Sequence, residues 1–342
     1  MRIVLQLPEV KRKKEERPSS CPHCRGETFQ SWGAVSRRLK DTKVRRVKIP
    51  RFKCTTCGKT FRFYPEGISH AQQSLRLMKL CVIMWSLGLS HRSVALILSV
   101  FGVQLSHMSA WRDLQEAGGA IRRKLEWKSA RVVGVDGAWV NGKGIMVAVD
   151  MGDGELLALA EVDEKDKSAV AAWLKVLKQK HKIGAIVTDD LSTYKELADE
   201  LELGHQVCQF HVRRWVGRAL KKLAEELPEE WLFLLSSIEQ LITDLPENGC
   251  QILYDYWEKM PGRTTQPDEA RTPLEKLRDL LLRLSRDWSR YIEFYSDAGI
   301  PWTNNRTEQI IGRFKNRAKR VRAYNTSQGL LMGSFAAAQF WT

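Results

Sequence analysis

The segment from residue 131 to 203 carries an order of strand and helix patterns that few folds accommodate. Three short apolar strands, 131–140, 144–151 and 156–162, are joined by the turn sequences NGKG and GDGE, which favour hairpins. An amphipathic helix follows, KDKSAVAAWLKVLKQKH, then a buried strand, KIGAIVT, and a second helix, LSTYKELADELEL. This β-β-β-α-β-α order predicts an α/β domain in which a crossover helix returns the fourth strand beside the first, in the centre of a mixed sheet.

Two aspartates lie where this sheet would bring them together. Asp136 is inside an apolar strand, where a lone carboxylate is costly unless it is paired or bound to a metal. Asp189 ends the fourth strand, at the edge where open α/β sheets place their sites. Because the first and fourth strands are predicted neighbours, we expect the two carboxylates to meet. The alternatives are Asp136 as a turn or edge residue, Asp189 as a helix cap, and Asp190 in the place of Asp189.

Two C-x-x-C pairs near the start of the chain predict a structural zinc site. Each pair places two sulfur atoms on one turn, and two pairs complete a tetrahedral four-thiolate site. Gly58 follows the second pair, as a tight turn requires, and the residues between the pairs alternate as a β-ribbon does. Chance pairing of reduced cysteines is the alternative. The predicted zinc ligands are Cys21, Cys24, Cys54 and Cys57.

The pattern becomes helical from Ser74 onwards. A helix ends at Gly88, and a second and a third helix are separated by a turn at Gly102. This spacing, with Ser106 as the cap of the last helix, fits a helix-turn-helix whose final helix would enter a DNA groove. A plain three-helix bundle is the alternative. The candidate DNA contacts are His107, Ser109 and Arg112.

A single acid, Glu308, precedes an uninterrupted basic stretch that begins in TNNRTEQIIGRFKNR. A solvated helix face with one stray glutamate would explain this pattern. The other interpretation is that Glu308 binds a metal ion while the cations after it bind a polyanion. Asn304 and Asn305 offer capping groups at the start of the predicted helix. The cations expected to face phosphates are Arg313, Arg317 and Arg320.

The charge of the chain is informative about its partners. The net charge is +15, and residues 1–53 alone carry 16 basic and 5 acidic side chains. Such a balance favours nucleic acid or an acidic membrane surface. The sequence contains no apolar run of about 18 residues and no signal-peptide core, so we expect a cytoplasmic protein without a membrane partner. In that compartment cysteines are thiols or metal ligands rather than disulfides.

Four short motifs, VGVDGAWV, VTDDLSTY, CQFHVRRW and TNNRTEQIIGRFKNR, together resemble those of the bacterial insertion-sequence DDE transposases. They are similar in particular to the group that has a zinc ribbon, a helix-turn-helix and an RNase H-like core with a helical insertion. The resemblance spans roughly residues 20–340 and implies a catalytic triad of Asp136, Asp189 and Glu308. Tyr194 matches the D-x-x-x-x-Y pattern. Residues implied in support are Cys208 and His211 of the C-x-x-H motif, with Asn304 and Asn305.

The resemblance implies a metal-dependent transposase that cleaves DNA at the ends of an insertion sequence and transfers the strands. These reactions are in-line displacements in which two divalent ions activate the attacking oxygen and stabilise the leaving oxygen. Mg²⁺, or Mn²⁺, prefers carboxylate ligands. Asp136 would bridge both ions, Asp189 would hold one and Glu308 the other. The implied partner is double-stranded DNA, both terminal repeats and target, bound by a homodimer or larger assembly at the nucleoid.

Composition and pattern together predict four parts. They are a basic zinc-ribbon domain (1–70), a helix-turn-helix domain (71–128), an RNase H-like α/β catalytic core (129–211 and 301–342) and an all-α insertion (212–300). Trp215, Trp231 and Trp288 recur at helical spacing in the insertion, which favours packing over the alternative of stacking on flipped bases.

Two other functions remain open at the level of the sequence. One is a zinc-containing DNA-binding regulator whose core has lost catalysis, which would bind DNA and never cut it. The other is an RNase H-like structure-specific nuclease, which would cut without joining. Cys208 and His211 are too few to form a second metal site by themselves, so we expect them to support the active site or the insertion.

Overall fold

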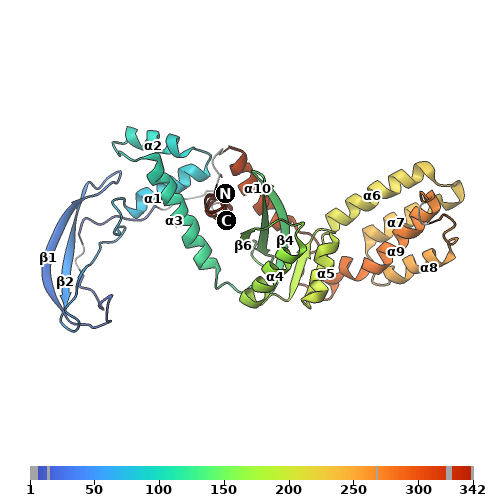
Figure 1. Cartoon of the computed structure of the whole chain (residues 1–342), viewed down its shortest axis with the longest axis horizontal. Helices are drawn as coiled ribbons and strands as arrows, with labels where there is room; N and C mark the ends of the chain where they lie inside the picture. Colours follow the sequence, from blue (N-terminus) through green and yellow to red (C-terminus); the bar gives the residue numbers. More distant parts are fainter. Residues whose placement is uncertain (1–6, 14–15, 267–268, 321–325, 340–342) are drawn as a thin grey trace. The chain divides into compact units, whose positions relative to one another are not determined.

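The computed structural model of this protein describes residues 7–13, 16–266, 269–320 and 326–339. The chain divides into two compact units, one formed by residues 1–122 with 316–342 and the other by residues 123–315. Figure 1 follows the chain through both units in order of sequence. Among the described residues, no helix is both long and apolar enough to span a bilayer.

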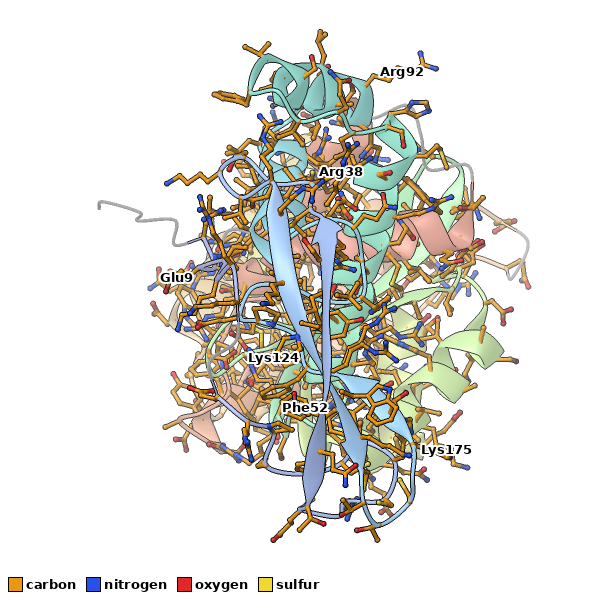
Figure 2. All side chains as sticks on the ribbon, turned by 90° about the vertical axis from the view of Figure 1, so that its left-hand side faces the viewer. Glu9, Arg38, Phe52, Arg92, Lys124 and Lys175 are labelled. Carbon is orange, nitrogen blue, oxygen red and sulfur yellow. The ribbon has the colours of Figure 1, made fainter. Side chains whose placement is uncertain are left out.

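The first unit begins with the predicted ribbon. Its three antiparallel strands, in the order β1-β2-β3, are β1 (Phe29–Arg38), β2 (Arg46–Cys54) and β3 (Thr60–Arg62). The hairpin runs from the pair Phe29 and Cys54 at one end to Arg38 and Arg46 at the other. Figure 2 looks onto this hairpin, with Arg38 toward one end and Phe52 toward the other. Phe52 packs among Phe29, Phe61 and Phe63, which gives so small a sheet an apolar side.

Three helices follow the ribbon, as the sequence predicts. They are α1 (Leu75–Ser86), α2 (His91–Val100) and α3 (His107–Leu125). Ser74 and Ser90 cap the first two, and the Ser106 hydroxyl accepts a hydrogen bond from the backbone N–H of Ser109 at 3.1 Å, so the predicted Ser106 cap is confirmed. Gly102, in the turn before α3, has a φ of +69°, a conformation that favours glycine.

The second unit is built on the predicted mixed sheet. Its strands, in the order β6-β5-β4-β7-β8, are β4 (Val132–Val140), β5 (Lys143–Asp150), β6 (Leu156–Glu161), β7 (Ala185–Thr188) and β8 (Gly204–Val207). The first three are antiparallel, and β4 pairs parallel with β7 through Val133 and Ile186. The expected central pairing is therefore confirmed, and the topology is that of an RNase H-like core. The sequence analysis missed β8.

Two helices bury one face of this sheet. They are α4 (Lys167–His181) and α5 (Ser192–Glu200). Leu174 and Tyr194 pack with Val135 and Ile186 in one core cluster. Apolar contacts therefore close the face of the sheet that α4 and α5 cover. The remaining face carries a smaller cluster that includes Val187 and Ile300.

The predicted insertion is a bundle of helices with its own core (Figure 1). The helices are α6 (Gln209–Glu226), α7 (Leu232–Asp244), α8 (Gly249–Lys259) and α9 (Pro273–Tyr291), with short 3-10 turns at Glu229–Trp231 and Glu293–Tyr295. Trp288 is 1% exposed, and its indole N–H donates to the Pro246 carbonyl. Trp215 and Trp231 pack against the same core while partly buried. Trp288 is therefore a core residue rather than a base-stacking one.

One close approach fixes the helix that carries Glu308, α10 (Asn305–Arg320). The Asn304 side-chain amide donates to the Val135 carbonyl of β4 at 3.1 Å, and its oxygen accepts from the Thr307 hydroxyl at 2.6 Å. Gly134 makes room for this contact, because a Cβ there would lie 2.1 Å from Thr307 Oγ1 and 2.5 Å from Asn304 Oδ1. The start of α10 is thus hydrogen-bonded to Val135, the residue that precedes Asp136 in β4.

The two compact units divide the C-terminal segment differently from the four predicted parts. The unit that contains the sheet ends at residue 315, whereas residues 316–342 group with the first unit. The apolar helix α11 (Ser327–Gln339) contacts α1, and Gly118 of α3 lies against the backbone of Met332. The boundaries of the four parts stay a prediction.

Substitution of Gly134 tests this close approach. We expect Gly134→Ala to lower the thermal midpoint by an amount equivalent to about 1–3 kcal/mol, because both colliding side chains are buried and hydrogen-bonded. Gly217→Ala in α6 is the matched control, since a Cβ there meets nothing within 4 Å and alanine favours the helix. Scanning calorimetry of both variants is the measurement, and equal midpoints would show that α10 does not depend on Gly134.

Candidate functional site

Four acidic side chains from separate elements of the second unit interact electrostatically. Asp136 lies on β4, Asp189 directly follows β7, and Glu308 lies in the first turn of α10. The fourth, Glu164, lies in the connection between β6 and α4. Asp189, Glu164 and Glu308 each raise the pKa of Asp136. The charges of Asp189 and Glu308, two acids singled out in the sequence, therefore both act on Asp136, and so does that of Glu164, which the sequence analysis missed.

Asp136 has the most perturbed environment of the four. Burial raises its pKa first, and the charges of Asp189, Glu164 and Glu308 add to this, so that the pKa reaches about 7. The backbone N–H of Gly137 donates to Asp136 Oδ1 at 2.8 Å and opposes the shift only in part. A carboxylate whose ionised form is disfavoured by both burial and like charge gains from a cation placed beside it.

Asp189 and Asp190 have opposite surroundings although they are adjacent. The Asp190 side chain is 5% exposed, and Lys195 Nζ and Arg283 Nη2 lie 2.5 and 2.7 Å from its two oxygens. Asp189 Oδ1 is buried without a hydrogen-bond partner, and the Asp189 carboxyl group, unlike that of Asp190, forms no ion pair in the described part of the chain. Burial, then Glu164, raises the pKa of Asp189 to about 6. Asp190 is neutralised by the protein itself, whereas Asp189 keeps an acceptor for a ligand.

Glu308 is held by the C-x-x-H motif. His211, in the first turn of α6, places Nε2 2.9 Å from Glu308 Oε1. Cys208 is fully buried, and its Sγ accepts a hydrogen bond from the backbone N–H of Asn304 at 3.2 Å. Because burial raises the pKa of the Cys208 thiol, this side chain is a neutral acceptor that fixes the residue before α10. Asn304 is buried and Asn305 is exposed.

Glu164 was missed because it stands among other charges in EVDEKD. Its Oε1 accepts a hydrogen bond from the hydroxyl of Tyr194, which is fully buried on α5. Gly137 leaves room for it, since a Cβ there would lie 2.5 Å from the Glu164 carboxyl group. Burial and Glu164 together raise the pKa of Tyr194, so the phenol remains a donor. The D-x-x-x-x-Y spacing was the one available signal, because it placed a buried hydroxyl near Asp189.

The donor set of this cluster fits a hard divalent cation. Carboxylate oxygens are the ligands that Mg²⁺ and Mn²⁺ prefer, and Asp189 Oδ1 is an unpartnered buried acceptor. In the described residues, Asp136, Asp189 and Glu308 do not form a set close enough to share one ion, whereas ligand atoms of Cys208, His211 and Glu308 lie within 4.8 Å of one another.

The four predicted zinc ligands lie together in the ribbon. One sulfur from each of Cys21, Cys24, Cys54 and Cys57 lies within 4.8 Å of all the others. The separations are 3.9 Å for Cys21 to Cys57 and 3.6 Å for Cys24 to Cys54. A tetrahedral site with Zn–S bonds of about 2.3 Å requires sulfur separations of about 3.8 Å. Gly58 has a φ of +69°. The cluster therefore fits a zinc ribbon.

The predicted DNA contacts do not all lie at the surface. His107 and Arg112 are exposed on α3, and Ser109 is half-buried. On α10, Arg320 is exposed and Arg313 is half-buried.

The prediction that Arg317 faces phosphates is wrong. Arg317 is 4% exposed, it donates to the Leu89 carbonyl at 2.7 Å, and its guanidinium lies 4.3 Å from the centre of the Trp85 ring. These contacts within the first unit leave its charge unable to face a phosphate.

The acid cluster predicts how stability depends on pH. The folded pKa of Asp136 is raised, so its contribution to stability is complete below the unfolded pKa and is lost as the pH rises through about 7. Without added Mg²⁺, we expect the thermal midpoint to fall between about pH 5.5 and pH 8, and Asp136→Asn to be more stable at the higher pH by a few kcal/mol at most.

The same experiment includes the cation. Millimolar MgCl₂ should raise the midpoint of the wild type at the higher pH and leave Asp136→Asn unchanged. Scanning fluorimetry is the measurement. Asp244→Asn, an exposed acid at the end of α7, is the control and should behave as the wild type does. A wild-type midpoint insensitive to MgCl₂ would argue against a cation site at Asp136.

Metal content tests the cysteine cluster. We expect about one zinc per chain by elemental analysis of dialysed protein, and a loss of that zinc in Cys54→Ser because three thiolates bind zinc more weakly than four. Cys250→Ser is the control, since Cys250 lies exposed in the bundle, where its Sγ is 3.4 Å from the Ser285 hydroxyl. Equal zinc content in the two variants would contradict the assignment.

Similarity to known proteins agrees with the motifs. Residues 161–330 match the model of the Transposase IS66 family, a segment that contains Asp189, His211 and Glu308 and begins after Asp136. Over 340 residues the chain is 22% identical to the "Insertion element ISM1 uncharacterized 48.3 kDa protein" of Methanobrevibacter smithii, covering 94% of this chain and 82% of that protein.

A solved structure, "Crystal structure of catalytic core domain of BIV integrase in crystal form I", matches 44% of this chain and 96% of its own, at 19% identity and a TM-score of 0.22. The match of residues 161–330 to the IS66 transposases, with the relative from an insertion element, confirms the resemblance to insertion-sequence transposases that the motifs indicate.

Proposed function

We propose that this protein is a DNA transposase that cleaves DNA at the ends of an insertion sequence and joins the strands to a target. The observation that supports the proposal is that the charges of Asp189 and Glu308 both act on the buried Asp136, although the three acids are distant in sequence. They stand on a core whose first and fourth strands are paired. Their positions in the sequence match the motifs of the insertion-sequence DDE transposases that this chain resembles.

The three acids are the ligands for Mg²⁺ or Mn²⁺ in this proposal. Divalent cations bound there supply activation of the attacking oxygen and stabilisation of the leaving oxygen at phosphorus. The pKa of Asp136 is about 7 and that of Asp189 about 6, so a bound cation would favour the fully ionised form of both carboxyl groups. Asp190 stays outside the chemistry because Lys195 and Arg283 hold it.

The surrounding residues position these ligands. His211 orients Glu308 through the 2.9 Å contact of Nε2 with Oε1. Asn304 ties the start of α10 to the backbone of β4 beside Asp136, and Cys208 accepts from the Asn304 backbone. Glu164, held by Tyr194, adds negative charge near Asp136 and Asp189 and so increases the attraction for a cation. These contacts give preorganisation, which limits the reorganisation needed when DNA binds.

The first unit supplies DNA binding in the proposal. Residues 1–53, which include most of the zinc ribbon, carry the excess of basic residues, and the exposed His107 and Arg112 lie on the first two turns of α3. Double-stranded DNA, first the element's ends and then the target, is the partner. A dimer or larger assembly follows from the need to hold two ends at once.

Strand transfer by variants of the acids tests the proposal. With a pre-cleaved end of the element, a target plasmid and Mg²⁺ or Mn²⁺, we expect Asp136→Asn and Asp189→Asn to lose joining by at least about a thousandfold, because each removes a ligand. Asp190→Asn should stay within about tenfold of the wild type while its thermal midpoint falls, since it loses two ion pairs.

The outcomes separate the remaining functions. Undiminished joining in Asp136→Asn would end the proposal. Cleavage without joining by the wild type would favour a nuclease, and specific DNA binding without any cleavage would favour a catalytically inactive regulator.

A further inference from the structure

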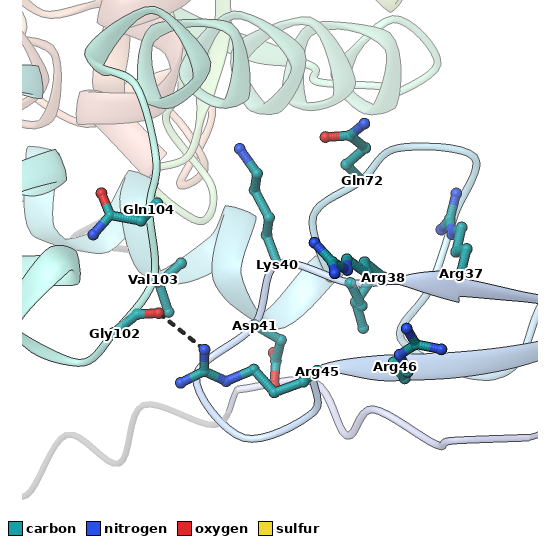
Figure 3. Close-up of a pocket in the computed structure, with 11 residues that line it drawn as sticks. Arg37, Arg38, Lys40, Asp41, Arg45, Arg46, Gln72, Gly102, Val103 and Gln104 are labelled. Atoms are coloured by element: carbon teal, nitrogen blue, oxygen red, sulfur yellow. Dashed lines mark hydrogen bonds between the residues drawn. The ribbon is translucent and has the colours of Figure 1, made fainter.

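A basic cavity of about 770 Å³ lies in the first unit, between the end of the ribbon and the turn before α3 (Figure 3). One wall is the end of β1 and β2 with the loop that joins them, and the other is the turn at Gly102. We call it the basic cavity. Its cationic lining residues are Arg37, Arg38, Lys40, Arg45 and Arg46.

The one acid that lines the basic cavity does not neutralise these cations. Asp41 is 1% exposed and pairs with Arg76, whose Nη2 lies 2.5 Å from Asp41 Oδ1. Burial alone would raise the pKa of Asp41, but hydrogen bonds from Arg76 and Ser74 outweigh it and lower the pKa to about 2. The charge of Asp41 is therefore used inside the protein, where it also accepts from the backbone of the loop.

Two of the cations are anchored by backbone carbonyls. Arg37 donates to Ser69 and His70 at 2.6 and 2.9 Å. Arg45 donates to Gly102 at 3.1 Å, the contact drawn in Figure 3. These contacts neutralise no charge. The Arg45 contact joins the two walls of the basic cavity, and the Arg37 contacts tie β1 to the segment before α1.

The other three cations have no acidic partner in the described part of the chain. Arg38 and Arg46 are directly opposite each other across β1 and β2, and both are exposed. Like charges at directly opposite positions of an antiparallel pair destabilise it. Lys40 lies beside them, half-buried in the same wall. An anion between these three would remove the repulsion, and planar guanidinium groups match the geometry of phosphate.

The position of α3 beside the basic cavity indicates which kind of phosphate the cavity would bind. Gln104, in the wall of the basic cavity, is two residues before Ser106, the cap of α3. The first turns of α3 carry the exposed His107 and Arg112. A helix that enters a groove of DNA has the sugar-phosphate backbone running beside its first turn.

We propose that the basic cavity binds the phosphodiester backbone of duplex DNA next to the groove entered by α3. This inference rests on the DNA-binding part of the proposed function and is independent of the acid cluster. Arg38, Arg46 and Lys40 contact the phosphates, while Arg37 and Arg45 are positioning residues. The contact is independent of base sequence and sets the register of α3 on the duplex.

The test uses the full-length, zinc-loaded chain carrying Asp136→Asn, without added Mg²⁺. The probe is a fluorescein-labelled duplex of random sequence, and the dissociation constant is measured by anisotropy over a range of KCl concentrations. We expect Arg38→Gln/Arg46→Gln to weaken binding about tenfold and to reduce the slope of log Kd against log salt by about 1.8, because each lost phosphate contact contributes about 0.9.

The control removes two equal charges from the same ribbon. Lys59→Gln/Arg62→Gln changes two exposed cations at or beside β3, which pairs with the half of β2 that lies away from the basic cavity. We expect a slope change well under one for this control. The thermal midpoint of Arg38→Gln/Arg46→Gln should be unchanged or raised, since a repulsive pair is gone. Equal weakening by both double variants would overturn the proposal, because it would show a general charge effect.

Inorganic phosphate is the second arm. Calorimetric titration of phosphate at fixed ionic strength should show no strong binding, because one small dianion spans only part of the basic cavity. Strong phosphate binding that Arg38→Gln/Arg46→Gln abolishes, with duplex affinity unchanged, would overturn the assignment to DNA. Loss of strand transfer by the wild type would refute the catalytic proposal and leave this result standing, since no cation or cleavage enters the binding measurement.

Discussion

The central physical constraint on this structure is the repulsion between carboxylates at a site that is largely shielded from water. Asp136 lies within a strand, and the negative charges of Asp189, Glu164 and Glu308 raise its pKa. Asp189 has a buried oxygen without a hydrogen-bond partner in the described part of the chain. Such an arrangement costs folding free energy unless a cation compensates it. The raised pKa values of about 7 and about 6 express this cost. In the proposed function, cations bound at these carboxylates compensate this cost.

Backbone pairing and close packing hold the elements that carry these charges in place. Parallel pairing of β4 with β7 places Asp136, on β4, and Asp189, directly after β7, on neighbouring segments of the sheet. Gly134 admits Asn304 and Thr307, so that the helix bearing Glu308 begins against β4. Glycine at 137 admits the Glu164 carboxyl group in the same way. The neighbouring Asp190 shows the contrast, because Lys195 and Arg283 balance it and make it part of the scaffold.

Sequence patterns predicted the core because its signals are local. Alternating apolar strands, two hairpin turns and a crossover helix determine which strands are neighbours, and this order predicts that Asp136 and Asp189 lie near each other. Strand β8 was missed because it has four residues, two of them the polar His205 and Gln206, which are buried by tertiary contacts. Glu164 was missed for a related reason: its partner Tyr194 is 30 positions away. Arg317 was assigned to DNA on charge alone, and periodicity gives no warning that Trp85 and a backbone carbonyl would bury it.

The central claim is that Asp136 and Asp189 bind divalent cations, and anomalous diffraction tests it most directly. Crystals of the full chain soaked in MnCl₂ should show an anomalous peak in contact with carboxylate oxygens of both residues, and crystals of Asp136→Asn treated in the same way should lack it. A wild-type map with no peak at Asp136, or with a peak only between Cys208, His211 and Glu308, where three ligand atoms also lie close together, would contradict the account.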